Sequence, residues 1–130
     1  MLPKLRLPAR SIAAALGLSL LGLGLTAPGA RVDAASRSFE VTASKYRFDP
    51  DVVEVEQGDR VTLHVRSADS DHGLEIKAYK AKVLVPRGGE VVPLELVADK
   101  PGTFPFACSE YCGSGHSRMR GRLVVKARTP

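Results

Sequence analysis

Hydrophobic and polar residues alternate along most of the chain after residue 38, a pattern typical of strands that bury one face. The clearest case is the segment in which Val61, Leu63 and Val65 alternate with polar residues. Other strand-like segments, separated by turns rich in Gly, Pro and Asp, cover residues 39–48, 52–56, 73–76, 82–85, 91–97, 103–107 and 120–126. Short strands with such regular turns predict one all-β domain, a sandwich or barrel, without repeats.

The first 34 residues follow a different pattern. Three basic residues without an acid precede an apolar run over residues 12–25, and small residues then lead to Ala34. This is the order of regions in a secretory signal peptide. We therefore predict that residues 1–34 are a signal peptide and that cleavage follows Ala34.

The same apolar run also supports a membrane tether. It is shorter than the ~20 residues that a spanning helix prefers, but it approaches that length if it extends through Ala30. An uncleaved anchor through residues 11–30 is therefore the alternative to cleavage. In both cases we predict that residues 35–130 form one exported domain, in the periplasm or another extracytoplasmic compartment.

The net charge argues against nucleic acid as a partner. The whole chain has a formal charge of +5, and without residues 1–34 the 15 basic minus 13 acidic side chains leave +2, which is not the balance of a nucleic-acid-binding protein. The basic residues are concentrated near the C-terminus in a stretch without acids, and they are Arg118, Arg120, Arg122, Lys126 and Arg128. This stretch is either a solvated strand edge or a docking surface for an acidic partner.

Residues 108–119 combine side chains that bind soft metals. Both cysteines of the chain, Cys108 and Cys112, lie in this segment and are followed by His116 and Met119. Thiolate and thioether sulfurs are soft ligands and imidazole suits copper, so this set favours copper. Two glycines between Cys112 and His116 relax the backbone, as a tight metal loop requires.

Three other interpretations of the cysteine pair stand beside this one. An exported chain with two cysteines can form a disulfide, but a purely structural disulfide needs neither His116 nor Met119. A tetrahedral zinc site could use both cysteines and two histidines, but a thioether is a poor zinc ligand. A mononuclear blue copper site uses one cysteine, two histidines and a methionine, so the second cysteine argues against it.

Three further residues are considered as members of the candidate set. His72 follows the strand over residues 60–67, in a loop that we expect at the same end of the sandwich as the cysteines. His64 falls on the outward phase of that strand and is expected at the surface. Glu110 lies between the two cysteines and could offer either its carboxylate or its backbone carbonyl.

These motifs resemble the CuA site of subunit II of haem–copper respiratory oxidases, and nitrous oxide reductases carry a related site. The matching residues are Cys-Ser-Glu-Tyr-Cys-Gly-Ser-Gly-His-Ser-Arg-Met at 108–119 and Asp-His-Gly at 71–73. The similarity includes Phe-Asp-Pro at 48–50, Gly-Asp at 58–59, Pro-Gly at 101–102 and Gly-Arg-Leu-Val-Val at 121–125. The resemblance implies a cupredoxin-like Greek-key β-sandwich or barrel.

The resemblance also implies a binuclear copper centre that carries single electrons. Its ligands would be two bridging thiolates, one histidine for each copper and two weak outer ligands, namely Cys108, Cys112, His72, His116, Met119 and the backbone carbonyl of Glu110. The implied function is electron transfer between redox proteins, with a cytochrome c-like donor and an oxidase or reductase as acceptor. The domain would have no catalytic residues of its own.

The chain departs from this family in ways that bear on its partner. It contains no Trp, whereas a tryptophan-containing aromatic stretch often serves electron entry from cytochrome c in these subunits. The segment after Met119 is basic, and an acidic docking face is not evident. These departures weigh against membership of an oxidase complex. A copper storage or delivery protein for a respiratory enzyme, and a tethered subunit II of a haem–copper oxidase, are the alternatives.

Overall fold

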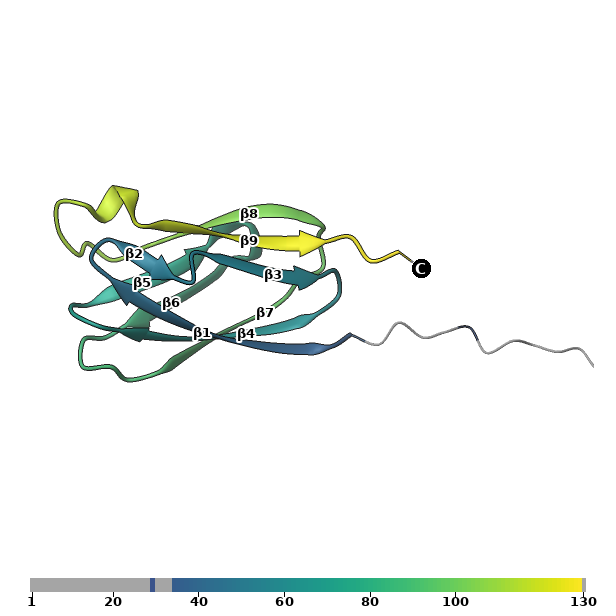
Figure 1. Ribbon diagram of the computed structural model, residues 1–130, viewed down its shortest axis with the longest axis horizontal. Coiled ribbons are helices and arrows are strands. Elements are labelled where there is room, and N and C mark those ends of the chain that lie inside the picture. The colour runs from purple at the N-terminus through teal and green to yellow at the C-terminus, as the bar shows by residue number, and fades with distance from the viewer. Residues whose placement is uncertain (1–28, 30–33, 130) are drawn as a thin grey trace, which may run out of the picture. The chain divides into compact units, whose positions relative to one another are not determined.

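Two β-sheets pack face to face in the computed structural model, which describes Gly29 and residues 34–129 (Figure 1). The four-stranded sheet has the order β2-β1-β4-β7, and the five-stranded sheet has the order β3-β9-β8-β5-β6. The strands are β1 (Ser36–Ser44), β2 (Arg47–Asp49), β3 (Val52–Glu56), β4 (Arg60–Ser67), β5 (His72–Ile76), β6 (Ala81–Val85), β7 (Val92–Val97), β8 (Gly102–Ala107) and β9 (Arg120–Lys126).

The helices of the described residues are two single 3₁₀ turns, η1 (Lys77–Tyr79) and η2 (His116–Arg118). No helix in this part of the chain is long and apolar enough to cross a membrane. The predicted signal peptide or anchor over residues 1–34 lies almost wholly outside the described residues, so it stays a prediction.

The all-β prediction is confirmed, with two local corrections. The segment predicted over residues 39–48 is divided, because the chain turns at Lys45 and Tyr46 between β1 and β2. His72 is the first residue of β5 and not part of a loop. The cause is the full-length antiparallel pairing of β5 with β6, in which His72 lies opposite Val85.

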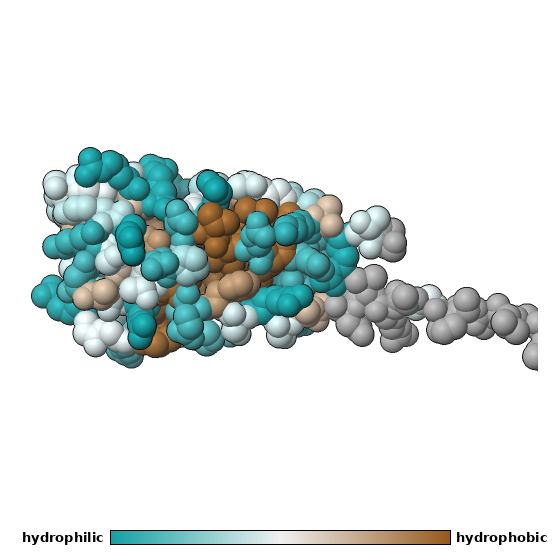
Figure 2. Space-filling view, viewed as in Figure 1, coloured by the Kyte–Doolittle hydropathy of each residue, from teal (hydrophilic) through white to brown (hydrophobic). Residues whose placement is uncertain are grey.

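The hydrophobic core lies between the sheets and follows the alternation seen in the sequence. Val61, Leu63 and Val65 of β4 are almost completely buried, while the outward-facing His64 is half-buried. Figure 2 shows apolar residues reaching the surface in the middle of one face, near β3, with hydrophilic residues around them. Burial of these apolar side chains is the main favourable contribution to packing of the two sheets.

The two ends of the sandwich carry different features (Figure 1). β5 begins, β8 ends and β9 begins at one end, so the segment of residues 108–119 that joins β8 to β9 lies there. We call this the loop end. β1 begins at Ser36 and β9 finishes at Lys126 at the opposite end.

The opposite end is held together by ion pairs that involve part of the basic stretch. Arg128 contacts the buried Asp59 at 2.8 Å and Glu56 at 2.9 Å, and Lys126 contacts Glu54 at 2.9 Å. Burial alone would raise the pKa of Asp59, but the Glu56 backbone N–H and the Arg128 guanidinium outweigh it and hold the pKa below its usual value. Two of the five basic residues near the C-terminus are thus neutralised locally.

Candidate metal centre

Three of the predicted ligands lie on the inward-facing rows of β5, β8 and β9, at the first residue of β5 or just outside the ends of β8 and β9. His72 has the same phase on β5 as the buried Leu74, and only 1% of its surface is exposed. Cys108 follows β8 in phase with the buried Phe106. The Cys108 N–H donates to the Met119 carbonyl at 3.1 Å, one step past the last β8–β9 pair. The site therefore forms as a continuation of the hydrophobic core.

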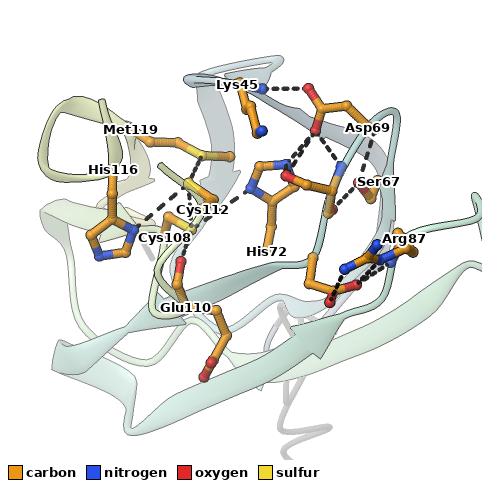
Figure 3. Close-up of polar contacts among 12 residues, drawn as sticks. Lys45, Ser67, Asp69, His72, Arg87, Cys108, Glu110, Cys112, His116 and Met119 are labelled. Carbon is orange, nitrogen blue, oxygen red and sulfur yellow. Dashed lines mark hydrogen bonds and ion pairs between the residues drawn. The ribbon is translucent and has the colours of Figure 1, made fainter. Parts of the chain in front are cut away.

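Two cysteine sulfurs form the middle of this cluster (Figure 3). The Sγ atoms of Cys108 and Cys112 are 3.8 Å apart, and both cysteines are free and buried. The Nδ1 atom of His72 lies 3.9 Å from the Cys108 sulfur, and the Nδ1 atom of His116 lies 3.7 Å from the Cys112 sulfur. The thioether sulfur of Met119 lies 3.9 Å from the Cys112 sulfur. Each sulfur therefore has a histidine nitrogen of its own.

Glu110 presents its backbone, and not its carboxylate, to the cluster. The Glu110 carbonyl oxygen lies 3.0 Å from the Cys108 sulfur, close enough to accept the thiol proton. Figure 3 shows its side chain directed away from the sulfurs, and the carboxylate lies 4.0 Å from the Lys82 ammonium. Of the two groups that the sequence left open for Glu110, the carbonyl is the one that faces the sulfurs.

The segment of residues 108–119, which we call the ligand loop, packs closely on Tyr46. A Cβ added at Gly113 or Gly115 would overlap the Tyr46 ring, and Gly113 has a positive φ of 135° that other residues rarely adopt. The loop then closes into η2, where the His116 N–H donates to the Gly113 carbonyl at 3.1 Å. Both glycines are thus needed for the turn that brings His116 back to the cysteines.

A carboxylate fixes the orientation of the His72 ring. The Nε2 atom of His72 donates to Asp69 Oδ1 at 2.7 Å, which leaves Nδ1 facing the Cys108 sulfur. Partial burial opposes ionisation of Asp69, but hydrogen bonds from the Lys45 backbone N–H, the His72 ring and the Ser70 N–H outweigh it and lower the pKa of Asp69 to about 2. Asp69 is therefore an anionic acceptor throughout the physiological range.

The two thiols share a poorly solvated space. Burial raises the pKa of the Cys112 thiol to about 11, and the neighbouring Cys108 contributes to the same rise. Two thiolates side by side in such a place require cationic charge between or beside them. A soft metal cation supplies that charge, and the donor set of thiolate, imidazole and thioether fits copper.

The comparison with family models decides what this fold is. The sequence matches the cupredoxin-like domain over residues 13–125. The chain belongs to the cupredoxin-like family. The predicted cupredoxin fold is thereby confirmed.

The curated relatives of this cupredoxin include a subunit of an oxidase and a reductase. It is 34% identical over 86 residues to cytochrome c oxidase subunit 2 of Thermus thermophilus. The aligned region covers 66% of this chain and 63% of that one. It is 32% identical over 92 residues to nitrous-oxide reductase of Cupriavidus necator, covering 68% of this chain but 14% of the reductase. The cupredoxin thus spans less than two thirds of these relatives.

A solved structure supports the same fold. The periplasmic domain of subunit II of cytochrome oxidase from Bradyrhizobium japonicum superposes with a TM-score of 0.63 over 74% of this chain and 88% of that one. The sequences are 20% identical, so this likeness describes the architecture of the cupredoxin and nothing finer.

Two residues of the cupredoxin site were not found from the sequence. Asp69 could have been noticed, because it precedes His72 by three residues and acidic residues often orient metal-binding histidines. Tyr46 carried no such signal, because its contact with Gly113 and Gly115 joins distant parts of the chain.

Proposed function

We propose that this cupredoxin is a single-electron carrier with a binuclear CuA centre at the loop end. One observation carries the proposal: the Cys108 and Cys112 sulfurs lie side by side, and a different histidine nitrogen adjoins each. Two cysteines would bridge two copper ions, and His72 and His116 would bind one ion each. Met119 and the Glu110 carbonyl would be the weak outer ligands.

The position of His116 favours two metal ions over one tetrahedral ion. Ligand atoms of His72, Cys108 and Cys112 all lie within 4.8 Å of one another. The His116 nitrogen adjoins Cys112 but falls outside that group. Four donors around one zinc ion would have to converge on a single point, whereas these two histidines adjoin opposite members of the sulfur pair.

The protein contributes rigidity and a route to the surface. Two copper ions that share two thiolates would supply one-electron redox chemistry with the charge spread over both metals. His72, Cys108, Cys112 and Met119 are at most 7% exposed, so packing keeps these side chains in place in both oxidation states. His116 is only partly buried and its ring lies 5.7 Å from the exposed Tyr111 ring. Electrons would therefore pass through this side of the site.

The partners that follow are other redox proteins. We propose a cytochrome c-like donor and an oxidase or reductase as acceptor, in an extracytoplasmic compartment, because the relatives are an oxidase subunit and a nitrous-oxide reductase. The domain would pass electrons without converting a substrate itself. Membership of an oxidase complex, through a tether at residues 11–30, belongs to the same proposal.

Copper analysis of the purified full chain tests the function. We expect two copper ions per chain, a purple colour and an electron paramagnetic resonance signal of one unpaired electron shared by both ions. One copper per chain with an intense blue band would contradict the binuclear centre. A colourless Cu(I) form that exchanges its metal rapidly with a chelator would identify a copper storage or delivery protein instead.

Asp69→Ala should weaken copper binding at the His72 side of the centre. The substitution removes the acceptor that orients His72, and loss of such a partner typically costs ~10- to 100-fold in metal affinity. Titration against a competing Cu(I) chelator measures the change, and the reduction potential should shift as well. Asp69→Asn retains an acceptor and should lose less.

Asp71→Asn is the matched control for Asp69. Asp71 lies one residue from His72, but its carboxylate contacts Arg87 at 3.2 Å. Copper affinity of this variant should equal that of the native chain. Equal affinities for Asp69→Ala and the native chain would show that packing alone orients His72.

A further inference from the structure

Three arginines beside the loop end have no acidic partner among the described residues. Arg118, Arg120 and Arg122 are exposed, and no carboxylate in this part of the chain lies within 4.0 Å of their guanidinium groups. Lys126 and Arg128, from the same basic stretch, do pair with acids. The basic stretch is therefore neutralised at the far end of β9 and left uncompensated next to the candidate copper ligands.

These arginines adjoin the ligand loop directly. Arg118 and Arg120 flank Met119, and Arg120 pairs across the sheet with Ala107, the residue before Cys108. The Arg120 Nε–H donates to the Ser117 carbonyl at 2.9 Å, which holds the side chain against η2. The positive charge is therefore placed close to the site by the fold itself.

A hollow of about 360 Å³ lies on the outer face of the five-stranded sheet, the face from which Arg120 projects. Its lining includes Arg120, Lys77 and Cys108, with Glu75 as its one acid. Arg122 points out of β9 beside it, opposite Pro105 of β8. We call this surface, made by Lys77, Arg118, Arg120 and Arg122, the basic face. Two of its four cations, Lys77 and Arg120, line the hollow together with Glu75, and Cys108 belongs to the same lining.

We propose that the basic face is the docking surface for an acidic redox protein. This rests on the proposed function, because it places the partner's redox centre beside the loop end. Uncompensated charge at the rim of an interface steers association and sets its salt dependence. The exposed Tyr111, with 79% of its surface accessible, adds an apolar contact next to His116. In the transfer itself, one electron leaves the ferrous haem of the cytochrome c-like donor, which becomes ferric, and reduces the oxidised domain.

A pair of cytochromes that differ only in surface charge tests this proposal. The probes are a lysine-rich cytochrome c and the same protein with its lysines succinylated, which makes it acidic. We expect the acidic probe to bind more tightly than the lysine-rich probe at low salt and, in its reduced form, to reduce the oxidised domain faster. Both differences should decline toward ~0.15 M salt, where the Debye length is about 8 Å. Calorimetry measures binding independently of copper, and stopped-flow absorbance measures electron transfer.

Charge reversal then locates the surface. Arg120→Glu with Arg122→Glu should lower the rate with the acidic probe by ~10-fold or more at low salt. The control is Arg60→Glu with Arg66→Glu, which makes the same charge change at exposed, outward positions of the other sheet. This control should change the rate much less, and both double variants should keep the native copper content and spectrum.

The outcomes separate docking from function. Equal losses in the two double variants, or tighter binding of the lysine-rich probe by the native chain, would overturn the basic face as a docking surface. Binding of the acidic probe that depends on Arg120 and Arg122 but yields no electron transfer would support the docking surface and contradict the electron carrier.

Discussion

Cys112→Ser should reduce the copper content from two ions per chain to at most one and eliminate the shared-electron resonance signal. The Cys112 sulfur lies within 3.9 Å of the Cys108, His116 and Met119 donor atoms, so its loss affects three other candidate ligands at once. A serine hydroxyl is a hard oxygen donor and does not replace a bridging thiolate for copper. The purple colour should be lost at the same time. Metal analysis and electron paramagnetic resonance measure the result.

Ser114→Ala is the control for this substitution. Ser114 is exposed and lies in the same loop, between the two glycines that pack on Tyr46. Its replacement should leave the copper content and the spectrum unchanged. An unaltered binuclear spectrum in Cys112→Ser would exclude Cys112 from the centre, whereas loss of copper in both variants would point to a disturbed loop.

Phe106→Ala should lower the free energy of unfolding by about 3–5 kcal/mol, since it removes a large side chain from the core. Phe106 is 1% exposed and packs edge-to-face on Phe48 with the ring centroids 5.3 Å apart. Its ring also occupies the space that a Cβ would need at Gly121. Phe106 and Gly121 are the inward-facing residues next to Cys108 and Met119 on β8 and β9. The loop end should therefore lose stability before the rest of the domain. Chemical denaturation with and without copper measures both effects.

The control for Phe106 is Phe104→Ala on the same strand. Phe104 is only half-buried, with its ring 5.2 Å from the Tyr79 ring. Its loss should cost about 1–2 kcal/mol, in proportion to the smaller apolar area that it buries. Equal destabilisation by the two substitutions would mean that β8 is not packed more tightly toward the loop end.

The strands were predictable because the alternation of apolar and polar residues follows from the burial of one face of each strand. Val61, Leu63 and Val65 face the core in the structure as their spacing requires, and the limits of β4 and β9 agree with the expected strands. The division at Lys45 and Tyr46 was not predictable in this way. Tyr46 has the apolar character of a strand residue, but its ring is used by the ligand loop, and only the tertiary structure brings the two together.

The site was predictable in its ligand types and less so in its geometry. The spacing of Cys108, Cys112, His116 and Met119 along the chain is enough to predict that these residues share one cluster. His72 was expected in a loop but belongs to β5, and the alternation through Leu74 and Ile76 already contained that information. The role of Asp69 depends on a hydrogen bond whose acceptor the sequence does not single out.

The chain enters β1 and leaves β9 at the end of the sandwich opposite the ligand loop, and the seven residues of β9 span about 20–24 Å. Anything joined at Ser36 or Lys126 therefore stands a full strand length from His116 and Tyr111. A surface, fusion partner or electrode attached there would leave the loop end open to solution. It would also be too remote for rapid direct electron exchange, so current from a domain immobilised in this way should depend on a soluble mediator that reaches the free end.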